Sequence, residues 1–254
     1  ALGSKPPTIR EVPNPRAFRL LERTPEMSKT AILVDGGFYR KRAAHLWGHH
    51  TPAETADGLI RYCYRHLTEH HAKHELYRIF YYDCPPISKK MYHPLLGKTI
   101  DLGQQDYFKW MNDFLTLLKQ KRKVALRLGV LDDANSVYSL KYEAVKKLCS
   151  GALSVDNLKE SDFFPTISQK GVDMKIGIDI ASLAYKQQVG QIVLIAGDSD
   201  FVPAAKLARR EGIDIILDPL EQAVKENLFE HIDGKRSCGN PYKRADEELS
   251  AYKV

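Results

Sequence analysis

Short apolar runs alternate along the chain with longer stretches in which apolar residues recur at helical spacing. Several of these runs are almost entirely apolar, which is typical of strands that are buried on both faces of a sheet. The run at 76–82 is instead rich in aromatic and β-branched residues, which also favour strands. Strands are expected at Thr30–Val34, Leu76–Tyr82, Val124–Val130, Ile192–Ala196 and Ile213–Leu217.

The stretches between these strands carry the spacing of amphipathic helices. Strands that alternate with helices favour a parallel sheet with helices packed on both faces. The sequence therefore predicts an α/β fold, a three-layer sandwich around a mainly parallel central sheet. Helices are expected at Phe38–Leu46, Ala53–Ala72, Gln104–Lys121, Tyr142–Leu148, Phe201–Arg210 and Gln222–Phe229, with one more after Gly171.

The same pattern divides the chain into three parts. Residues 1–26 hold five of the 13 prolines, and we expect there a flexible extension or a remnant ahead of a native start at Met27. Residues 27–230 form the predicted domain, within which about 85–164 has the least regular pattern and is expected to be an insertion. Residues 231–254 are expected to form a polar tail.

Composition narrows the class of protein. With 254 residues, of which 43% are hydrophobic, the chain can bury a full core. No apolar run reaches the roughly 18 residues of a membrane-spanning helix, and the first residues do not resemble a signal peptide. The four cysteines lack the spacing of a zinc site or a disulfide framework. We therefore expect a cytoplasmic protein without a membrane partner.

Acidic residues follow the strands at positions where parallel sheets place their sites. Asp35 ends the first strand, and Asp198 and Asp200 follow the strand at Ile192–Ala196. Asp173 begins the helix that precedes that strand. The carboxyl ends of parallel strands meet at one edge of the sheet, so we expect these four side chains to converge there.

Converging carboxylates repel one another and raise one another's pKa values unless a cation neutralises them. Oxygen ligands without a nearby His or Cys favour Mg²⁺ or Mn²⁺ over Zn²⁺. Such an ion activates water and stabilises a phosphoryl transition state, so the pattern indicates phosphodiester hydrolysis. Three of the four acids also have a structural interpretation: Asp35 as a turn residue, Asp200 as a helix cap and Asp173 as a favourable charge at a helix start.

Other candidates carry less weight. Asp179 is rotated by roughly 120° from Asp173 around the same helix, so we assign it to a supporting contact or a salt bridge. Asp218 follows the last strand but precedes Pro219. His70 and His74 have helical spacing, for which a solvated helix face is the better interpretation.

The distribution of positive charge suggests an anionic partner. The formal net charge is +6, and basic clusters recur along the chain, several of them beside aromatic residues. Phosphate contacts with occasional base stacking need that mixture. Arg40, Lys41 and Arg42 are the best candidates, because their helix begins just after Asp35; a solvated helix face remains an alternative. The sequence leaves homo-oligomerisation open.

Three motifs resemble the NYN family, specifically its bacterial DUF88 or LabA-like branch, which is related to PIN-domain nucleases. They are Ile32–Phe38 (Ile-Leu-Val-Asp-Gly-Gly-Phe), Gln169–Lys175 (Gln-Lys-Gly-Val-Asp-Met-Lys) and Val193–Phe201 (Val-Leu-Ile-Ala-Gly-Asp-Ser-Asp-Phe). The resemblance implies a PIN-like sheet, divalent-metal binding and cleavage of RNA. By motif position it implies metal ligation by Asp35, Asp173, Asp198 and Asp200, with Lys170 and Ser199 in supporting roles at the RNA.

One position departs from that family pattern. Many relatives have Asn three residues after the first Asp, where this chain has Phe38, so a contact from that position to substrate or to metal-bound water is in doubt.

We therefore predict an endoribonuclease that depends on Mg²⁺ or Mn²⁺. The alternative from another class is a non-catalytic RNA-binding or regulatory module of the same fold. A haloacid-dehalogenase-type phosphatase would want a second Asp where Gly37 stands, and a dinucleotide-binding enzyme would want a Gly-x-Gly-x-x-Gly motif after the first strand.

Overall fold

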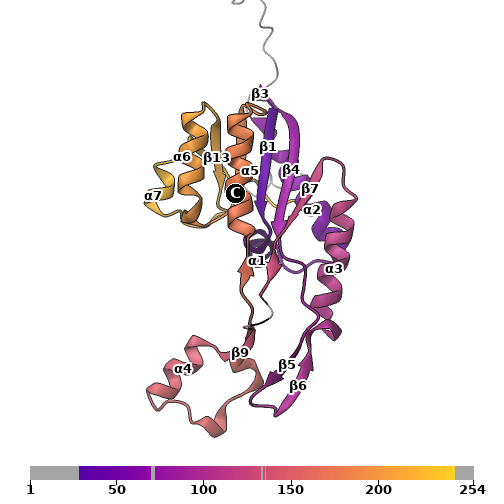
Figure 1. Ribbon diagram of the computed structural model, residues 1–254, viewed down its shortest axis with the longest axis vertical. Helices are drawn as coiled ribbons and strands as arrows, with labels where there is room; N and C mark the ends of the chain where they lie inside the picture. Colours follow the sequence, from indigo (N-terminus) through magenta and orange to yellow (C-terminus); the bar gives the residue numbers. More distant parts are fainter. Residues whose placement is uncertain (1–28, 70–71, 133, 135, 244–254) are drawn as a thin grey trace, which may run out of the picture.

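A six-stranded, fully parallel sheet forms the centre of the protein (Figure 1). The computed structural model describes residues 29–69, 72–132, 134 and 136–243, so the expected extension at 1–26 lies outside it. The strand order is β14-β13-β12-β1-β4-β7. The strands are β1 (Lys29–Asp35), β4 (Glu75–Asp83), β7 (Val124–Leu128), β12 (Gln191–Ile195), β13 (Asp214–Asp218) and β14 (Gly234–Lys235).

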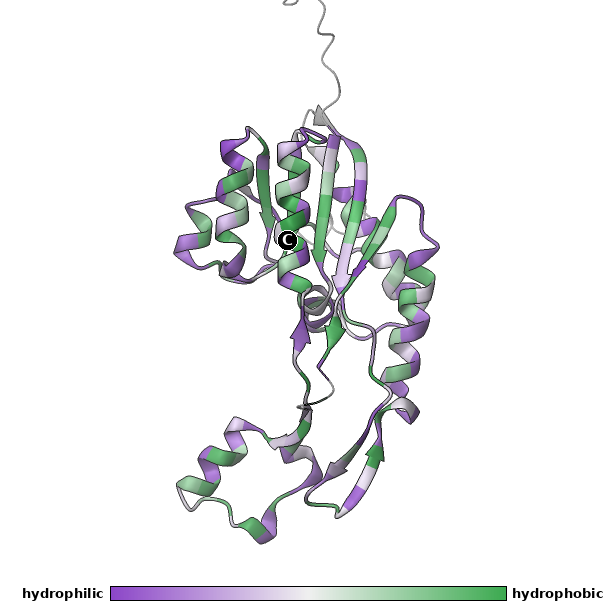
Figure 2. Ribbon diagram, in the orientation of Figure 1, coloured by the Kyte–Doolittle hydropathy of each residue, from purple (hydrophilic) through white to green (hydrophobic). Residues whose placement is uncertain are grey.

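The apolar runs form central strands because each face of the sheet has its own core. Along β1, alternate residues point to opposite faces: Ala31 and Leu33 join one cluster, and Ile32 and Val34 join the other. All four are completely buried. Strand β13 accordingly appears hydrophobic over most of its length in Figure 2, whereas β4 also carries hydrophilic positions.

Helices cover both faces and complete the three predicted layers. One face packs against α1 (Gly36–Trp47), α2 (Pro52–Arg65) and α3 (Asp106–Lys119). The other face packs against α5 (Val172–Tyr185) and α6 (Val202–Arg210), with the short α7 (Glu226–Phe229) beside them. None of the described helices is long and apolar enough to span a membrane.

The second helix ends earlier than predicted. It begins at a capping box between Thr51 and Glu54 and stops at Arg65, whereas the pattern predicted helix as far as Ala72. The chain turns instead into a small antiparallel pair, β2 (Thr68–Glu69) with β3 (Ala72–Lys73). His74 therefore lies between β3 and β4 and not on a helix, and His70 lies outside the described residues.

Only the two ends of the expected insertion at about 85–164 form an arm that projects from the carboxyl edge of the sheet, because α3 and β7 between them belong to a helical layer and to the central sheet (Figure 1). The small core of the arm surrounds the buried His93, whose ring centroid lies 4.5 Å from that of Tyr138 and 5.1 Å from that of Phe163. One short antiparallel pair at the root, β8 (Val130–Leu131) with β11 (Gln169–Lys170), leads into it. The arm contains β5 (Lys90–His93), β6 (Lys98–Asp101), β9 (Val137–Leu140), α4 (Tyr142–Cys149) and β10 (Phe163–Thr166).

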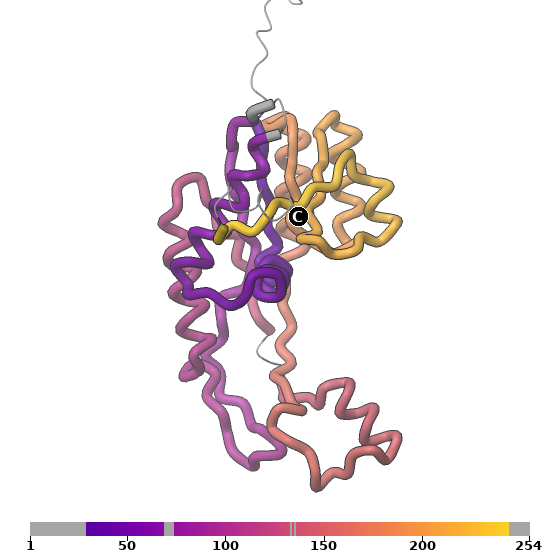
Figure 3. The backbone as a smooth tube through the Cα atoms, turned by 180° about the vertical axis from the view of Figure 1, so that it is seen from behind, coloured from indigo at the N-terminus to yellow at the C-terminus, as the bar shows by residue number. Residues whose placement is uncertain are grey.

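The polar tail expected from residue 231 onward is corrected by the structure. Residues 234–235 add the parallel strand β14 to the edge of the sheet. Residues 236–243, here called the C-terminal strap, then cross the α2 face (Figure 3). Hydrogen bonds from arginine side chains to backbone carbonyls hold the strap in both directions. Arg236 of the strap donates to the carbonyls of Arg65 and His66, and Arg61 of α2 donates to the carbonyl of Pro241 in the strap.

Candidate active site

Asp35 stands where β1 passes directly into α1. Its Oδ1 accepts a hydrogen bond from the backbone N–H of Phe38 at 3.0 Å, so it does serve as the N-cap of α1. The turn needs glycine at the next position, because a Cβ on Gly36 would lie 2.5 Å from both Asp83 Oδ2 and Tyr81 Oη. The tight turn places the half-buried Asp35 carboxylate at the carboxyl edge of the sheet.

Asp173 lies in the first turn of α5. The helix begins at Gly171, whose φ of 81° is in the left-handed region that favours glycine. Upstream, the backbone packs closely, since a Cβ on Gly129 would lie 2.6 Å from the carbonyl oxygen of Lys170. These two glycines allow the chain to return along the sheet edge and start α5 beside the strand ends.

Asp198 and Asp200 follow β12 on either side of a single residue. Asp198 caps the short 3₁₀ helix η5 (Ser199–Phe201), and its Oδ1 accepts a hydrogen bond from the backbone N–H of Asp200 at 3.2 Å. Both side chains belong to exposed residues. A Cβ on the preceding Gly197 would lie 2.4 Å from the ring of Phe38, so Phe38 fills the space above this turn.

The four predicted acids influence one another electrostatically. Burial raises the pKa of Asp35, and repulsion from Asp173 and Asp83 raises it further, while the hydrogen bond from Phe38 opposes the change. Burial also raises the pKa of Asp173, with repulsion from Asp198 and Asp200 added. The acids are therefore close enough to repel one another, Asp35 with Asp173, and Asp173 with Asp198 and Asp200.

The side chains of the four acids are not arranged around a common metal position. Within the described residues, no three His, Cys, Asp or Glu side chains are gathered closely enough to hold a metal ion as they stand. The donor set nevertheless fits a hard divalent cation: every candidate ligand is a carboxylate oxygen, and mutual repulsion disfavours the ionised forms of Asp35 and Asp173.

Asp83 is a fifth acid at this edge that sequence reasoning missed. It ends β4, is 1% exposed, and makes a bidentate ion pair with Arg40, with Nε to Oδ2 at 3.2 Å and Nη2 to Oδ1 at 3.0 Å. Tyr81 Oη donates to Oδ2 at 2.9 Å. The rule that found Asp35, an acid directly after a buried strand, would also have found Asp83.

Two of the residues predicted to bind RNA have partners inside the protein. The guanidinium of Arg40 is committed to Asp83, and that of Arg42 donates to the carbonyl of Leu220 at 3.2 and 2.9 Å. These contacts give both arginines a structural role, because the cations neutralise or satisfy groups of the fold, and their binding to RNA stays a prediction. Lys41, between them, is exposed and directed away from these contacts.

The two supporting residues are also engaged. Lys170 Nζ lies 2.6 Å from Asp132 Oδ2, with the lysine side chain 62% exposed. Ser199 Oγ accepts a hydrogen bond from Lys225 Nζ at 3.3 Å. Lys225 is a cation beside the acids that the sequence pattern did not single out.

An open groove of about 1440 Å³ begins at the acids and runs over α1. Its walls come from elements far apart in the sequence: α1, the start of α3, the root of the arm and the end of the C-terminal strap. Residues that line it include Asp35, Phe38, Lys41, His45, His49, His50, Tyr107, Trp110, Gln169, Asp198, Lys225 and Tyr242.

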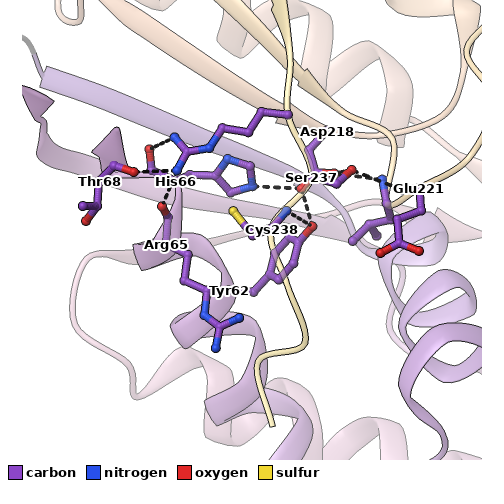
Figure 4. A network of polar contacts seen from close by, with 10 residues as sticks. Tyr62, Arg65, His66, Thr68, Asp218, Glu221, Ser237 and Cys238 are labelled. Atoms are coloured by element: carbon purple, nitrogen blue, oxygen red, sulfur yellow. Dashed lines mark hydrogen bonds and ion pairs between the residues drawn. The ribbon is translucent and has the colours of Figure 1, made fainter. Parts of the chain in front are cut away.

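The weaker candidates are structural. Asp179 Oδ2 accepts hydrogen bonds from Tyr82 Oη and Arg127 Nε, both at 2.8 Å, which confirms the salt-bridge interpretation. Asp218 is completely buried in the network of Figure 4. Its carboxylate accepts hydrogen bonds from Tyr62 and Ser237 and contacts His66 Nε2 at 2.8 Å.

Comparison with known proteins gives a match to a family model over part of the chain. No curated protein sequence matches the chain. Among solved structures, a protein of unknown function from Vibrio parahaemolyticus RIMD 2210633 aligns with a TM-score of 0.46 and 12% identity, over 86% of this chain and 98% of that one. A similarity this low does not establish a shared fold or function.

The NYN domain matches residues 104–229. The matched segment contains Asp173, Asp198 and Asp200, whereas Asp35 lies outside it on β1, which pairs directly with β12. An NYN domain implies a PIN-like nuclease fold, in agreement with the parallel sheet and its two helical layers. The match supports the NYN family for this chain.

Proposed function

We propose that this protein is a divalent-metal-dependent endoribonuclease. The observation that carries the proposal is the chain of carboxylates at the carboxyl edge of the sheet, in which burial and mutual repulsion raise the pKa values of Asp35 and Asp173. Asp83 and Asp179, which stabilise the fold, have cationic partners, whereas the groups that shift the pKa of Asp173 are all acidic. An acid cluster that weakens itself is better explained by a ligand that it holds.

Asp35, Asp173, Asp198 and Asp200 would hold the ion, Mg²⁺ or Mn²⁺. When bound, such an ion supplies Lewis-acid stabilisation of negative charge at phosphorus and makes water a stronger nucleophile. The backbone N–H of Phe38 and the Gly36 turn orient Asp35, and the buried Arg40–Asp83 pair keeps that turn rigid. Lys41 and Lys225 are the cations of the groove that could hold phosphate groups over the acids.

We expect RNA cleavage that requires Mg²⁺ or Mn²⁺ and stops in EDTA, because the acids cannot approach a phosphate without a cation between them. Attack by water leaves a 5′-phosphate and a 3′-hydroxyl. The test is incubation of purified protein with mixed RNA substrates, with Mn²⁺ or with EDTA, followed by mass analysis of the product ends.

Three results would count against the proposal. Cleavage that persists in excess chelator would exclude the metal-dependent route. Products with 2′,3′-cyclic phosphate ends would indicate attack by the ribose hydroxyl. RNA binding without cleavage under any metal would favour the alternative, a non-catalytic RNA-binding module.

We further propose that the chain belongs to the DUF88 or LabA-like branch and acts in the cytoplasm. The Gly-Asp-Ser-Asp-Phe element at 197–201 and the Lys-Gly-Val-Asp element at 170–173 support the branch. Cysteine spacing that fits no disulfide framework supports the compartment.

A further inference from the structure

The start of α3 presents two aromatic side chains to the same groove that contains Asp35 and Asp198. Tyr107 is 59% exposed, and Trp110 follows three residues later on the same face of the helix. Exposed aromatic residues are common when they occur singly, whereas here the exposed Tyr107 and the half-buried Trp110 line one wall of the groove at helical spacing. The residues of α3 that face the core, such as Phe114 and Leu118, are completely buried.

Both rings are held in place by contacts on the protein side. Tyr107 Oη accepts a hydrogen bond from Arg40 Nη1 at 3.2 Å, and Arg40 is itself fixed by its ion pair with Asp83. Tyr107 is thus tied, through two buried groups, to the turn that carries Asp35.

The ring of Trp110 is fixed just as firmly. It stacks on Phe114, with centroids 5.3 Å apart and an interplanar angle of 18°, and its Nε1 donates to the carbonyl of His50 at 3.1 Å. Because these contacts already order the ring, a flat ligand that stacks on it loses little conformational entropy on binding.

The rest of the groove carries the charge that such a ligand needs. Lys41 on α1 and Lys225 before α7 line it together with His45 and His49. Aromatic rings can stack on bases, and cations on the neighbouring elements can contact phosphates, so the groove is complementary to a single-stranded nucleic acid. The faces of paired bases are covered by their neighbours in a duplex, so only unpaired bases can use such a wall.

We propose that Tyr107 and Trp110 are substrate-positioning residues, which stack on unpaired bases of the RNA and so set the phosphate over the acids. The inference rests on the proposed function for the identity of the polymer. The residues belong to α3, at the root of the arm, which the strand-end pattern did not mark as part of a site.

A binding experiment in EDTA tests the inference without requiring cleavage. The affinity of a labelled single-stranded RNA, measured by fluorescence anisotropy, should fall about tenfold with Tyr107→Ala, within the range for loss of one base–aromatic stack. Tyr107→Phe keeps the ring and should bind normally. Tyr185→Ala, which removes an aromatic residue that is 64% exposed on α5 and does not line the groove, is the matched control.

A second readout reports on Trp110 directly. The chain has two tryptophans, so a Trp47→Phe variant leaves Trp110 as the only indole. Single-stranded RNA should quench its fluorescence, because a stacked base is in contact with the indole, whereas a duplex of the same sequence should not. This signal does not depend on catalytic activity or on the stability of a Trp110 variant.

The outcomes separate the inference from the proposed function. If the protein cleaves RNA but Tyr107→Ala binds normally and Trp110 is not quenched, the inference is wrong and the nuclease assignment stands. If no metal supports cleavage but both stacking signals are present, the positioning role stands and the nuclease assignment fails. Equal quenching by duplex and single strand would overturn the requirement for unpaired bases.

Discussion

Asp173→Asn is expected to lower the rate of RNA cleavage by roughly 10³-fold, the size of effect found when one preorganised electrostatic group is removed from an active site. Asp173 is the best acid to test, because it has repulsive neighbours on the β12 side, Asp198 and Asp200, and its carboxylate does not cap a helix or bridge to a cation. Cleavage of a labelled RNA under single-turnover conditions with Mn²⁺ measures the change.

Asp179→Asn is the matched control, since it makes the same substitution on the same helix. Asp179 is paired with Arg127 and Tyr82, so its loss should lower stability while cleavage by the folded protein persists. Normal cleavage by the Asp173 variant would remove this acid from the proposed site.

The Asp173 variant should also change how stability depends on pH in metal-free buffer. Burial and repulsion raise the pKa of Asp173 in the folded state, so the folded protein binds this proton more tightly than the unfolded chain does. This group therefore lowers the free energy of unfolding as the pH rises through the interval above the usual Asp pKa. Urea titrations in EDTA at about pH 5 and about pH 7 measure the free energy of unfolding. Between these two pH values it should fall less for Asp173→Asn than for the wild type.

A stability profile with the opposite sign would favour the structural interpretation of this acid. If Asp173 stabilised the start of α5 through its charge, the asparagine variant would be less stable at neutral pH. The two interpretations thus predict changes in opposite directions in one measurement.

Asp218→Ala is expected to destabilise the fold by about 3–5 kcal/mol, the range for removing one partner of a buried charge pair. The carboxylate is completely buried and accepts hydrogen bonds from Tyr62 Oη at 2.6 Å and Ser237 Oγ at 2.7 Å (Figure 4). Its removal leaves those hydroxyls and the buried His66 without their acceptor. Equilibrium urea denaturation measures the loss.

Asp57→Ala provides the comparison, because Asp57 also makes an ion pair, with Lys121, but its side chain is 50% exposed. Exposed pairs contribute only about 0–1 kcal/mol. Similar losses in the two variants would show that the network around Asp218 does not hold the C-terminal strap to α2.

The fold was predictable because apolar runs at β1, β12 and β13 can only be buried between two layers of helices. Asp35, Asp198 and Asp200 were predictable for the same reason: once the strands are placed, the residues after them lie at one edge. Asp83 follows the same rule, because it comes directly after the strand predicted to end at Tyr82.

The hydrogen-bond acceptors of the cationic side chains at 40–42 could not be predicted from the sequence. Arg40, Lys41 and Arg42 are consecutive, yet the helix directs Arg40 to Asp83 and Arg42 to the carbonyl of Leu220, while Lys41 stays exposed. Local spacing does not say which long-range acceptor a side chain meets. The C-terminal strap was missed for a related reason, because it is held by hydrogen bonds to α2 and carries no apolar periodicity.

The position of β1 has a consequence for the order in which the protein can fold during synthesis. β1 emerges early and is central, with β4 on one side and β12 on the other. Thr30 donates a hydrogen bond to Gln191, 161 positions later in the chain. Until the ribosome has released β12, β1 can pair only with β4 and keeps an open backbone edge, which is where nascent chains associate wrongly. We therefore expect this protein to depend on chaperones, or on slow translation of its first half, more than a protein of similar size whose neighbouring strands are also neighbours in sequence.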